Sequence, residues 1–159
     1  MDNIEYFTYQ PGTVDYRELL HFLEETDDLI EPRLSTRVDI VEYSKKVAKN
    51  ATMFVAKRGL EWIGVEAVYF NAYPEFSFTT TLRVRKEYHN NSTVGLDLML
   101  MQKRYLKKNG TKGLRFAIRK NNTQLLNYHL KRGARILSEH VYPNTDIVEV
   151  EMEEVYIKD

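Results

Sequence analysis

The sequence predicts an α/β fold, with a mixed, largely antiparallel sheet of about seven strands and about four helices flanking it. Two observations lead to this prediction. Apolar residues alternate with polar ones in some segments and follow helical spacing in others, and the two kinds of segment succeed each other along the chain. A strand–helix–strand order in the middle favours a parallel pair, whereas short turns elsewhere favour antiparallel neighbours.

Composition narrows the class of protein. The chain has 159 residues, the size of one domain, and no linker or repeat divides 1–159. Its 23 basic and 23 acidic residues cancel, so no overall field favours nucleic acid or a membrane surface. Cysteine is absent, which excludes disulfide bonds and a thiol nucleophile. Without an apolar run long enough for a membrane span, the sequence predicts a soluble, cytoplasmic protein.

The first third of the chain predicts one strand and two helices. Alternation in 4–9 predicts a strand that ends before a Pro-Gly turn. Thr13 is the expected cap of the first helix. Thr36, with Asp39 three residues later, resembles a capping box that opens a second helix ending at Asn50.

The middle of the chain predicts three consecutive strands and a long helix. Segments 51–56, 60–70 and 76–84 are rich in β-branched and aromatic residues and are separated by turns, which indicates an antiparallel meander. Helical spacing then runs from about Thr93 to Gly110, a residue suited to a left-handed helix cap.

The last third predicts a strand, a helix and two further strands. The apolar segment 114–118 is the next strand, and a helix from Asn122 to Arg132 ends at Gly133. Segments 134–142 and 147–157 supply the two final strands.

The polar turn before the long helix predicts an anion site. The first amide groups of a helix lack internal partners, and the helix dipole adds roughly half a positive charge at that end. A phosphate or pyrophosphate therefore binds well there. The residues expected to contribute are those of the turn and the helix start: Asn90, Asn91, Ser92, Thr93, Val94 and Gly95.

Two segments give the chain a resemblance to the GCN5-related N-acetyltransferase (GNAT) superfamily. In the first, a strand ending at Val84 precedes a turn with Gly95 and a helix that ends at Gly110, fifteen residues later. The second is a spaced pattern that the family shares, carried by Asn122, Leu125, His129, Gly133 and Ala134. The turn departs from the family pattern, because Asn90 stands for its Arg or Gln and Thr93 for its first glycine.

The resemblance implies a sheet that is splayed in the middle and an acetyl-CoA-dependent N-acetyltransferase acting on a primary amine of a small molecule. Leu82 and Val84 would hydrogen-bond the pantetheine arm through their backbones, the turn would bind the pyrophosphate, and Asn122 would face the cofactor. Because the paired glycines and the family's tyrosine are missing, a catalytically impaired binding or structural module with the same fold remains the alternative.

Candidate catalytic residues also follow from the resemblance. His129 takes the place of the tyrosine that often protonates the leaving thiolate, and an imidazole can serve as that acid at neutral pH. Glu66 and Glu75, on the second and third meander strands, are the candidate general bases, with His89 beside the turn as a further one. The four histidines show no metal-ligand spacing, so no metal is expected.

Two weaker expectations concern partners. Residues 34–56 resemble the front of bacterial acetyltransferases found among surface-polysaccharide enzymes, which suggests an amino sugar as the acceptor. An edge strand such as 147–157 could pair between subunits, so a homodimer is left open.

Overall fold

The structure, a computed structural model, describes residues 3–156. Within that range there are seven strands and four α-helices. The strands are β1 (Ile4–Tyr9), β2 (Thr52–Arg58), β3 (Glu61–Tyr73), β4 (Phe76–Val84), β5 (Gly113–Arg119), β6 (Arg135–Val141) and β7 (Val148–Val155). The helices are α1 (Tyr16–Glu25), α2 (Ile40–Asn50), α3 (Val94–Lys108) and α4 (Thr123–Lys131). The predicted order of elements is confirmed; the predicted last strand reached residue 157, which lies outside the described residues.

The sheet is mixed, as predicted. Its hydrogen-bonded strand order is β1-β2-β3-β4-β5-β7-β6. β1–β2, β2–β3, β5–β7 and β6–β7 pair antiparallel, whereas β4 pairs parallel with β5 through Phe76–Phe78 and Gly113–Arg115. The parallel pair is the one that α3 connects, because a helical crossover lets the second strand run in the direction of the first. The predicted fold class is therefore confirmed.

Contacts between residues divide the chain into two compact units. The first unit comprises Met1–Tyr69 and Thr80–Tyr105, and the second comprises Phe70–Thr79 and Leu106–Asp159. β3, β4 and α3 each have residues in both units.

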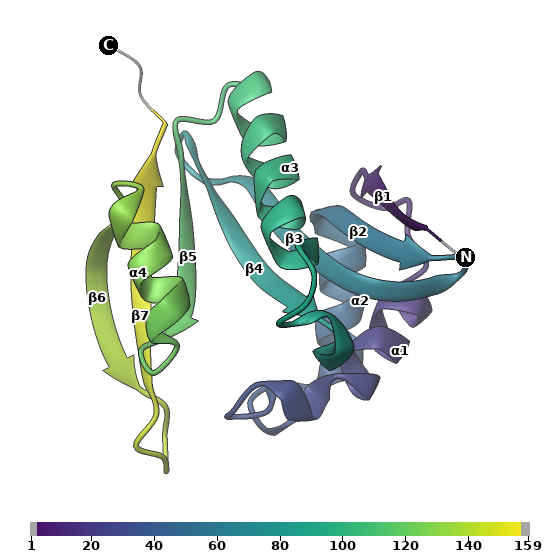
Figure 1. Ribbon diagram of the computed structural model, residues 1–159, viewed down its shortest axis with the longest axis horizontal. Helices are drawn as coiled ribbons and strands as arrows, with labels where there is room; N and C mark the ends of the chain where they lie inside the picture. The colour runs from purple at the N-terminus through teal and green to yellow at the C-terminus, as the bar shows by residue number, and fades with distance from the viewer. Residues whose placement is uncertain (1–2, 157–159) are drawn as a thin grey trace. The chain divides into compact units, whose positions relative to one another are not determined.

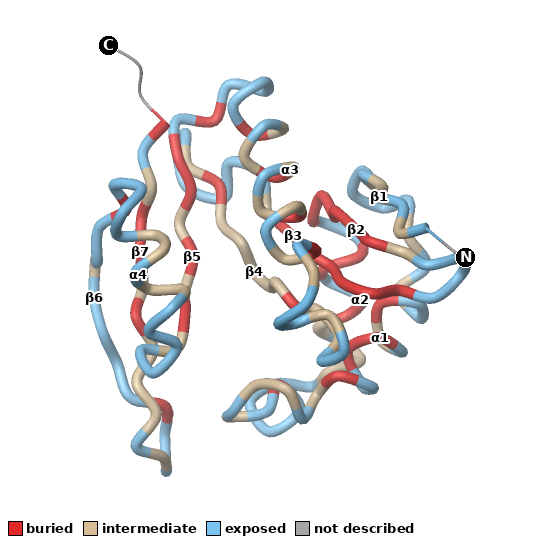
Figure 2. The backbone as a smooth tube through the Cα atoms, in the orientation of Figure 1, coloured by how far each residue is buried: buried red, intermediate tan, exposed pale blue. Residues whose placement is uncertain are grey.

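In the first unit helices cover both faces of the sheet (Figure 1). Phe22 of α1 and Val47 of α2 belong to one buried cluster with Val65 of β3. α3 packs closely on the other face, because a methyl group added at Gly64 of β3 would lie 3.2 Å from Leu98 Cδ1. Burial on both faces explains why the β2 and β3 sequences are nearly continuous apolar runs, and Figure 2 shows these strands as the buried centre of the unit.

The first two helices begin at aspartates, so the predicted threonine caps are wrong. Asp15 accepts a hydrogen bond from one amide of the first turn of α1, and Asp39 accepts from two amides of α2, at 2.9–3.1 Å. Thr13 and Thr36 instead donate to carbonyl oxygens three residues earlier, at 2.7 Å. A carboxylate is the stronger acceptor for helix amides, and both aspartates lie one residue before the helical segment.

In the second unit α4 lies across one face of the sheet made by β5, β7 and β6 (Figure 1). The ring centre of His129 on α4 lies 4.4 Å from that of Phe116 on β5. The neighbouring strand residues point to the opposite face, where Glu153 accepts hydrogen bonds from Arg115 at 3.0 Å and Arg135 at 2.9 Å. Burial raises the pKa of Glu153, but the two guanidinium groups outweigh it and leave this pKa below its usual range.

Two helices end at the predicted glycines. Gly110 has φ +85° and Gly133 has φ +91°, the left-handed region in which a Cβ is strained. The residue after each glycine donates its amide to the carbonyl oxygen five residues earlier, Thr111 to Leu106 at 3.0 Å and Ala134 to His129 at 3.1 Å. This closure satisfies carbonyls that the helix end leaves open, and the prediction of glycine caps for both helices is confirmed.

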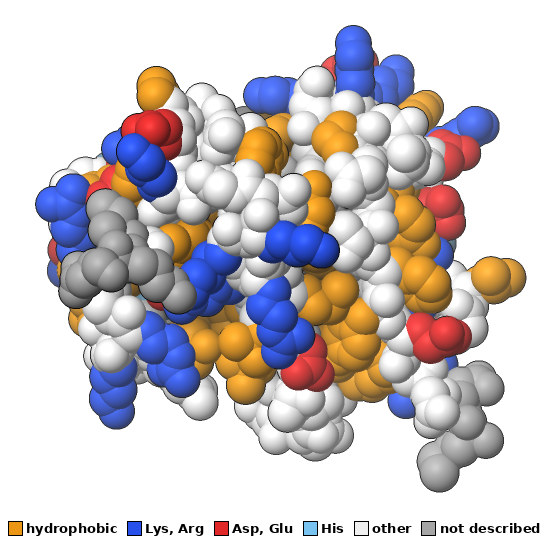
Figure 3. Space-filling model, turned by 90° about the horizontal axis from the view of Figure 1, so that it is seen from above, with side chains coloured by type: hydrophobic (Ala, Val, Ile, Leu, Met, Phe, Trp, Pro, Cys, Tyr) orange, Lys and Arg blue, Asp and Glu red, His pale blue; other side chains and the backbone are white. Residues whose placement is uncertain are grey.

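The surface carries charges of both signs. On the face in Figure 3, Lys, Arg, Asp and Glu side chains lie among hydrophobic ones. In the part of the chain that the structure describes, every helix is too short or too polar to cross a membrane.

A carboxyl group is buried between β3 and α3. Glu66 is 3% exposed, and its Oε1 has no hydrogen-bond partner among residues 3–156. Burial raises the pKa of Glu66 to about 8, although a hydrogen bond with Gln102 of α3 partly offsets this effect. The group is therefore mostly protonated at neutral pH.

We expect Glu66→Gln to remove a pH dependence of stability. The pKa of Glu66 is raised from 4.5 to about 8 in the folded protein, which therefore keeps a proton that the unfolded chain loses in that window. The free energy of unfolding should fall as the pH rises through it, by up to about 1.4 kcal/mol per pH unit. Urea unfolding of wild type and Glu66→Gln from pH 5 to 9 measures this slope. The exposed Glu75→Gln is the control, and equal slopes in all three proteins would contradict the burial argument.

Candidate functional site

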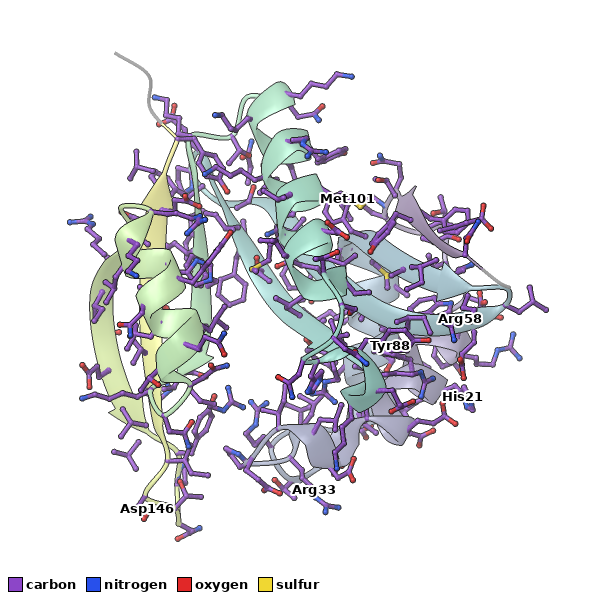
Figure 4. The ribbon with its side chains drawn as sticks, viewed as in Figure 1. His21, Arg33, Arg58, Tyr88, Met101 and Asp146 are labelled. Carbon is purple, nitrogen blue, oxygen red and sulfur yellow. The ribbon has the colours of Figure 1, made fainter. Side chains whose placement is uncertain are left out.

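The residues predicted to bind an anion, 90–95, lie at the end of the connection from β4 to α3, residues 85–93, and at the start of α3. The Arg85 amide donates to the carbonyl oxygen of Ile63 at 2.8 Å, which holds the start of the connection to β3. Farther along, the Ser92 hydroxyl donates to the carbonyl oxygen of Tyr88 at 2.7 Å. Arg58, at the end of β2, places its guanidinium carbon 5.2 Å from the centre of the Tyr88 ring (Figure 4). Both ends of the connection are therefore held within the first unit.

The start of α3 presents backbone amides. The Asp97 amide donates to the carbonyl oxygen of Thr93 at 2.7 Å, the first turn of the helical ladder. The three preceding amides, at Val94, Gly95 and Leu96, therefore lack helical partners. The Val94 amide has a long contact of 3.4 Å to Ser92 Oγ. The amides at Gly95 and Leu96 belong to the group that the sequence predicts to bind an anion.

Gly95 is not required by the fold. Its φ is not in the left-handed region, and an added Cβ would meet Val84 Cγ2 at 3.7 Å, an ordinary contact distance. Glycine in a helix lowers stability by about 0.5–1 kcal/mol relative to alanine. The position thus leaves a space beside the first-turn amides that a side chain would fill.

Asp97 of α3 accepts hydrogen bonds from two hydroxyl groups. Thr93 Oγ1 donates to Asp97 Oδ2 at 2.9 Å, and the hydroxyl of Tyr6, on β1, donates to the same oxygen at 2.9 Å. Neither Tyr6 nor Asp97 was among the predicted site residues. The four-residue spacing of Thr93 and Asp97 was a usable signal, whereas nothing in the sequence links Tyr6 to a residue 91 positions later.

The end of β4 carries Leu82 and Val84, both half-buried. The β4–β5 ladder ends at Phe78, so both residues lie beyond it. His89 Nε2 lies 2.6 Å from the carbonyl oxygen of Val84. A carbonyl only accepts, so Nε2 carries the proton and Nδ1 is the ring nitrogen left as a base.

Glu75 lies in the turn between β3 and β4, within the second unit. It is exposed, has φ +70°, and forms a 2.8 Å ion pair with Lys112. Because both side chains are exposed, this ion pair contributes little to stability.

Asn122 and His129 lie at opposite ends of α4, in the second unit. Asn122 caps the helix, because its Oδ1 accepts from the Leu125 amide at 3.2 Å. His129 is half-buried and packs on Phe116. The guanidinium carbon of Arg132 lies 3.8 Å from the ring centre of the neighbouring Tyr128.

The predicted site residues thus fall into two groups. The first unit brings together the end of β4, the turn and the start of α3, and it also holds Glu66. The second unit holds Glu75, Asn122 and His129. In neither unit do three or more His, Asp or Glu side chains of the described residues lie close enough to hold a metal ion.

Sequence comparisons with protein-family models and with curated proteins give no match. Solved structures do match. The ribosomal-protein-S18-alanine N-acetyltransferase of Escherichia coli is 13% identical with a TM-score of 0.75, over 98% of this chain and 96% of that one. A GNAT-family acetyltransferase of Streptococcus pneumoniae is 16% identical with a TM-score of 0.70, over 95% and 99%.

A third match was solved with a bound ligand. It is a proposed streptothricin acetyltransferase of Bacillus anthracis in complex with acetyl coenzyme A, 21% identical with a TM-score of 0.56. The alignment covers 68% of this chain and 64% of that one, so it spans less than two thirds of the Bacillus protein. At these identities the matches establish the fold, which is that of GNAT acetyltransferases.

We expect Asn122→Ala to lower the free energy of unfolding by about 1 kcal/mol, because the first turn of α4 loses its capping acceptor. Asn122→Asp keeps an acceptor at the same position and should retain most of the stability. Urea unfolding of the three proteins measures the difference, and an unchanged midpoint in Asn122→Ala would show that the cap contributes nothing.

Proposed function

We propose that the protein is an acetyl-CoA-dependent N-acetyltransferase that transfers an acetyl group to a primary amine of a small molecule. One observation carries the proposal: in a fold shared with solved acetyltransferases, the helix that follows β4 starts with amides that precede the first bond of its backbone ladder. The alternative is a binding or structural module with the same fold.

The first turn of α3 fits a pyrophosphate. The amides of Gly95 and Leu96 supply donors and the helix dipole favours negative charge. Gly95 leaves room for close approach, and the exposed side chains of Asn90 and Asn91 can add donors from the preceding turn. Thr93 has already given its proton to Asp97, so we propose that backbone amides rather than its hydroxyl bind the phosphate oxygens.

The pantetheine arm is proposed to lie along β4. It contains two amide groups, which can hydrogen-bond a strand as a peptide does. Leu82 can offer its backbone amide and carbonyl beyond the end of the β4–β5 ladder. Val84 can offer its amide, since its carbonyl oxygen is already bound by His89.

Acetyl transfer needs an unprotonated amine and a proton for the departing thiolate. Catalysis would come mainly from holding the two reactants in line, which can supply several orders of magnitude in rate. We propose His129 as the acid that protonates the thiolate. For the base, Glu66 has a suitable pKa of about 8 but a buried carboxyl group, whereas Glu75 and His89 are exposed.

The remaining assignments concern the whole chain. We propose that 1–159 acts as one acyltransferase domain, because three elements run continuously from one unit into the other. An amino sugar is the proposed acceptor, from the resemblance of residues 34–56. From the sequence we also propose a cytoplasmic location and a homodimer.

We expect coenzyme A to raise the melting temperature, with desulfo-CoA giving a similar shift and ATP a smaller one. Gly95→Ala should keep or raise the stability of the free protein and weaken CoA binding about tenfold, or ~1.4 kcal/mol. Gly95→Trp should abolish the shift. Thermal unfolding and calorimetric titration measure both effects. No shift in wild type at millimolar CoA would reject cofactor binding and favour the module, and a shift that survives Gly95→Trp would reject the placement of the pyrophosphate.

We expect His129→Ala to lower kcat about a hundredfold, the usual range for loss of a general acid, with CoA affinity unchanged. Steady-state assays over a panel of amino sugars and amines, with release of free thiol as the readout, measure this change. Tyr128→Phe is the matched control on the same helix. Equal kcat in wild type and His129→Ala would remove the histidine from the mechanism.

A further inference from the structure

One carboxylate ties three parts of the first unit together at the start of α3. Asp97 Oδ2 accepts the Thr93 hydroxyl and the Tyr6 hydroxyl, each at 2.9 Å. Thr93 precedes the first residue of the helix, Asp97 ends its first turn, and Tyr6 belongs to the first strand. The Asp97 amide also donates to the Thr93 carbonyl oxygen at 2.7 Å, so the two residues are joined through both backbone and side chain.

The chemistry of the three groups determines the direction of both hydrogen bonds. An ionised carboxylate only accepts hydrogen bonds, and a hydroxyl has a single proton to donate. Thr93 and Tyr6 therefore both donate to Asp97. The Thr93 proton is therefore engaged by Asp97 and is not available to a phosphate oxygen.

The Tyr6 hydroxyl keeps its proton beside Asp97. Burial raises the pKa of Tyr6 to about 12, with further contributions from the hydrogen bond to Asp97 and from its negative charge. A neutral phenol is thus held beside a carboxylate over the physiological range, which is a stable donor–acceptor pair.

The negative charge of Asp97 would act in opposite directions on the helix and on a bound anion. It stabilises the helix start, because the dipole is positive there, but it also repels a phosphate bound to the same amides. If charge were its main effect, Asp97 would weaken phosphate binding. If positioning dominates, its loss would weaken binding, because the turn and its amides would lose the contact with β1.

We propose that Asp97 is a positioning residue for the phosphate-binding turn, which it fixes by holding Thr93 and Tyr6. The inference rests on the proposed function, since it concerns the same amides. Asp97 would thus order the amides at the start of α3 before the anion binds.

Two variants of Asp97 distinguish the effect of its charge on CoA affinity from the effect of positioning. Asp97→Asn keeps an oxygen that accepts both hydroxyls and removes the charge, so CoA affinity should stay within about threefold of wild type or increase. Asp97→Ala removes the acceptor, and CoA affinity should fall about tenfold. Calorimetric titration with CoA measures affinity, and hydrogen exchange of the amides at 94–96 measures the order of the turn without any ligand.

Asp39→Ala is the matched control, because it removes an aspartate that caps α2 without touching α3. It should lower the melting temperature and leave CoA affinity unchanged. Should Asp97→Ala not fold, Thr93→Val removes one of the two ties at an exposed position, and CoA affinity should again fall.

The outcomes separate the two proposals. Wild type that does not bind CoA overturns the proposed function, and this inference with it. Wild type that binds CoA, with Asp97→Ala or Thr93→Val folded and binding equally well, overturns the positioning role alone. Asp97→Asn as weak as Asp97→Ala would also overturn it, since retention of the acceptor would then not matter.

Discussion

The start of α3 is the constraint on which the candidate site depends. Every helix leaves its first amides without backbone partners, and most proteins satisfy them with a capping side chain. In the described residues α1, α2 and α4 do so, with Asp15, Asp39 and Asn122 as acceptors. At α3 the residue in the capping position, Thr93, donates its hydroxyl proton to Asp97. The proposed function depends on the first-turn amides of α3, to which we assign the pyrophosphate.

Much of the fold could be predicted from the sequence because it depends on local patterns. The strands, the helices and the glycine caps at Gly110 and Gly133 follow from residue spacing and from backbone conformations that only glycine adopts readily. Helix starts were harder, since threonine and aspartate compete for the same role within a few residues and the carboxylate prevails. The hydrogen bond from Tyr6 to Asp97 could not be predicted, because sheet pairing and helix packing bring the two side chains together and no local sequence pattern indicates such a contact.

Glu66 and Glu153 show how neighbouring groups determine whether a buried carboxyl group is ionised. Glu153 and Glu66 are equally buried, at 3% exposure. Two guanidinium groups keep Glu153 ionised, whereas Glu66 meets only the amide of Gln102 and holds its proton to about pH 8. Both residues lie in strand sequences, and the sequence does not show which groups from other elements will face them, so their opposite protonation could not be predicted. Partners contributed by other strands and helices make the difference.

The hydrogen bond between Tyr6 and Asp97 also bears on how the chain folds. Its ends are separated by 91 residues, and Tyr6 occupies a strand that must first pair with β2, itself more than forty residues away. Contacts of such sequence separation form late, because the entropy of closing the loop opposes them until the intervening structure is in place. The helix start would thus acquire its final geometry only once the N-terminal strand has joined the sheet, so a partly folded chain would not yet present the proposed anion site in its native form.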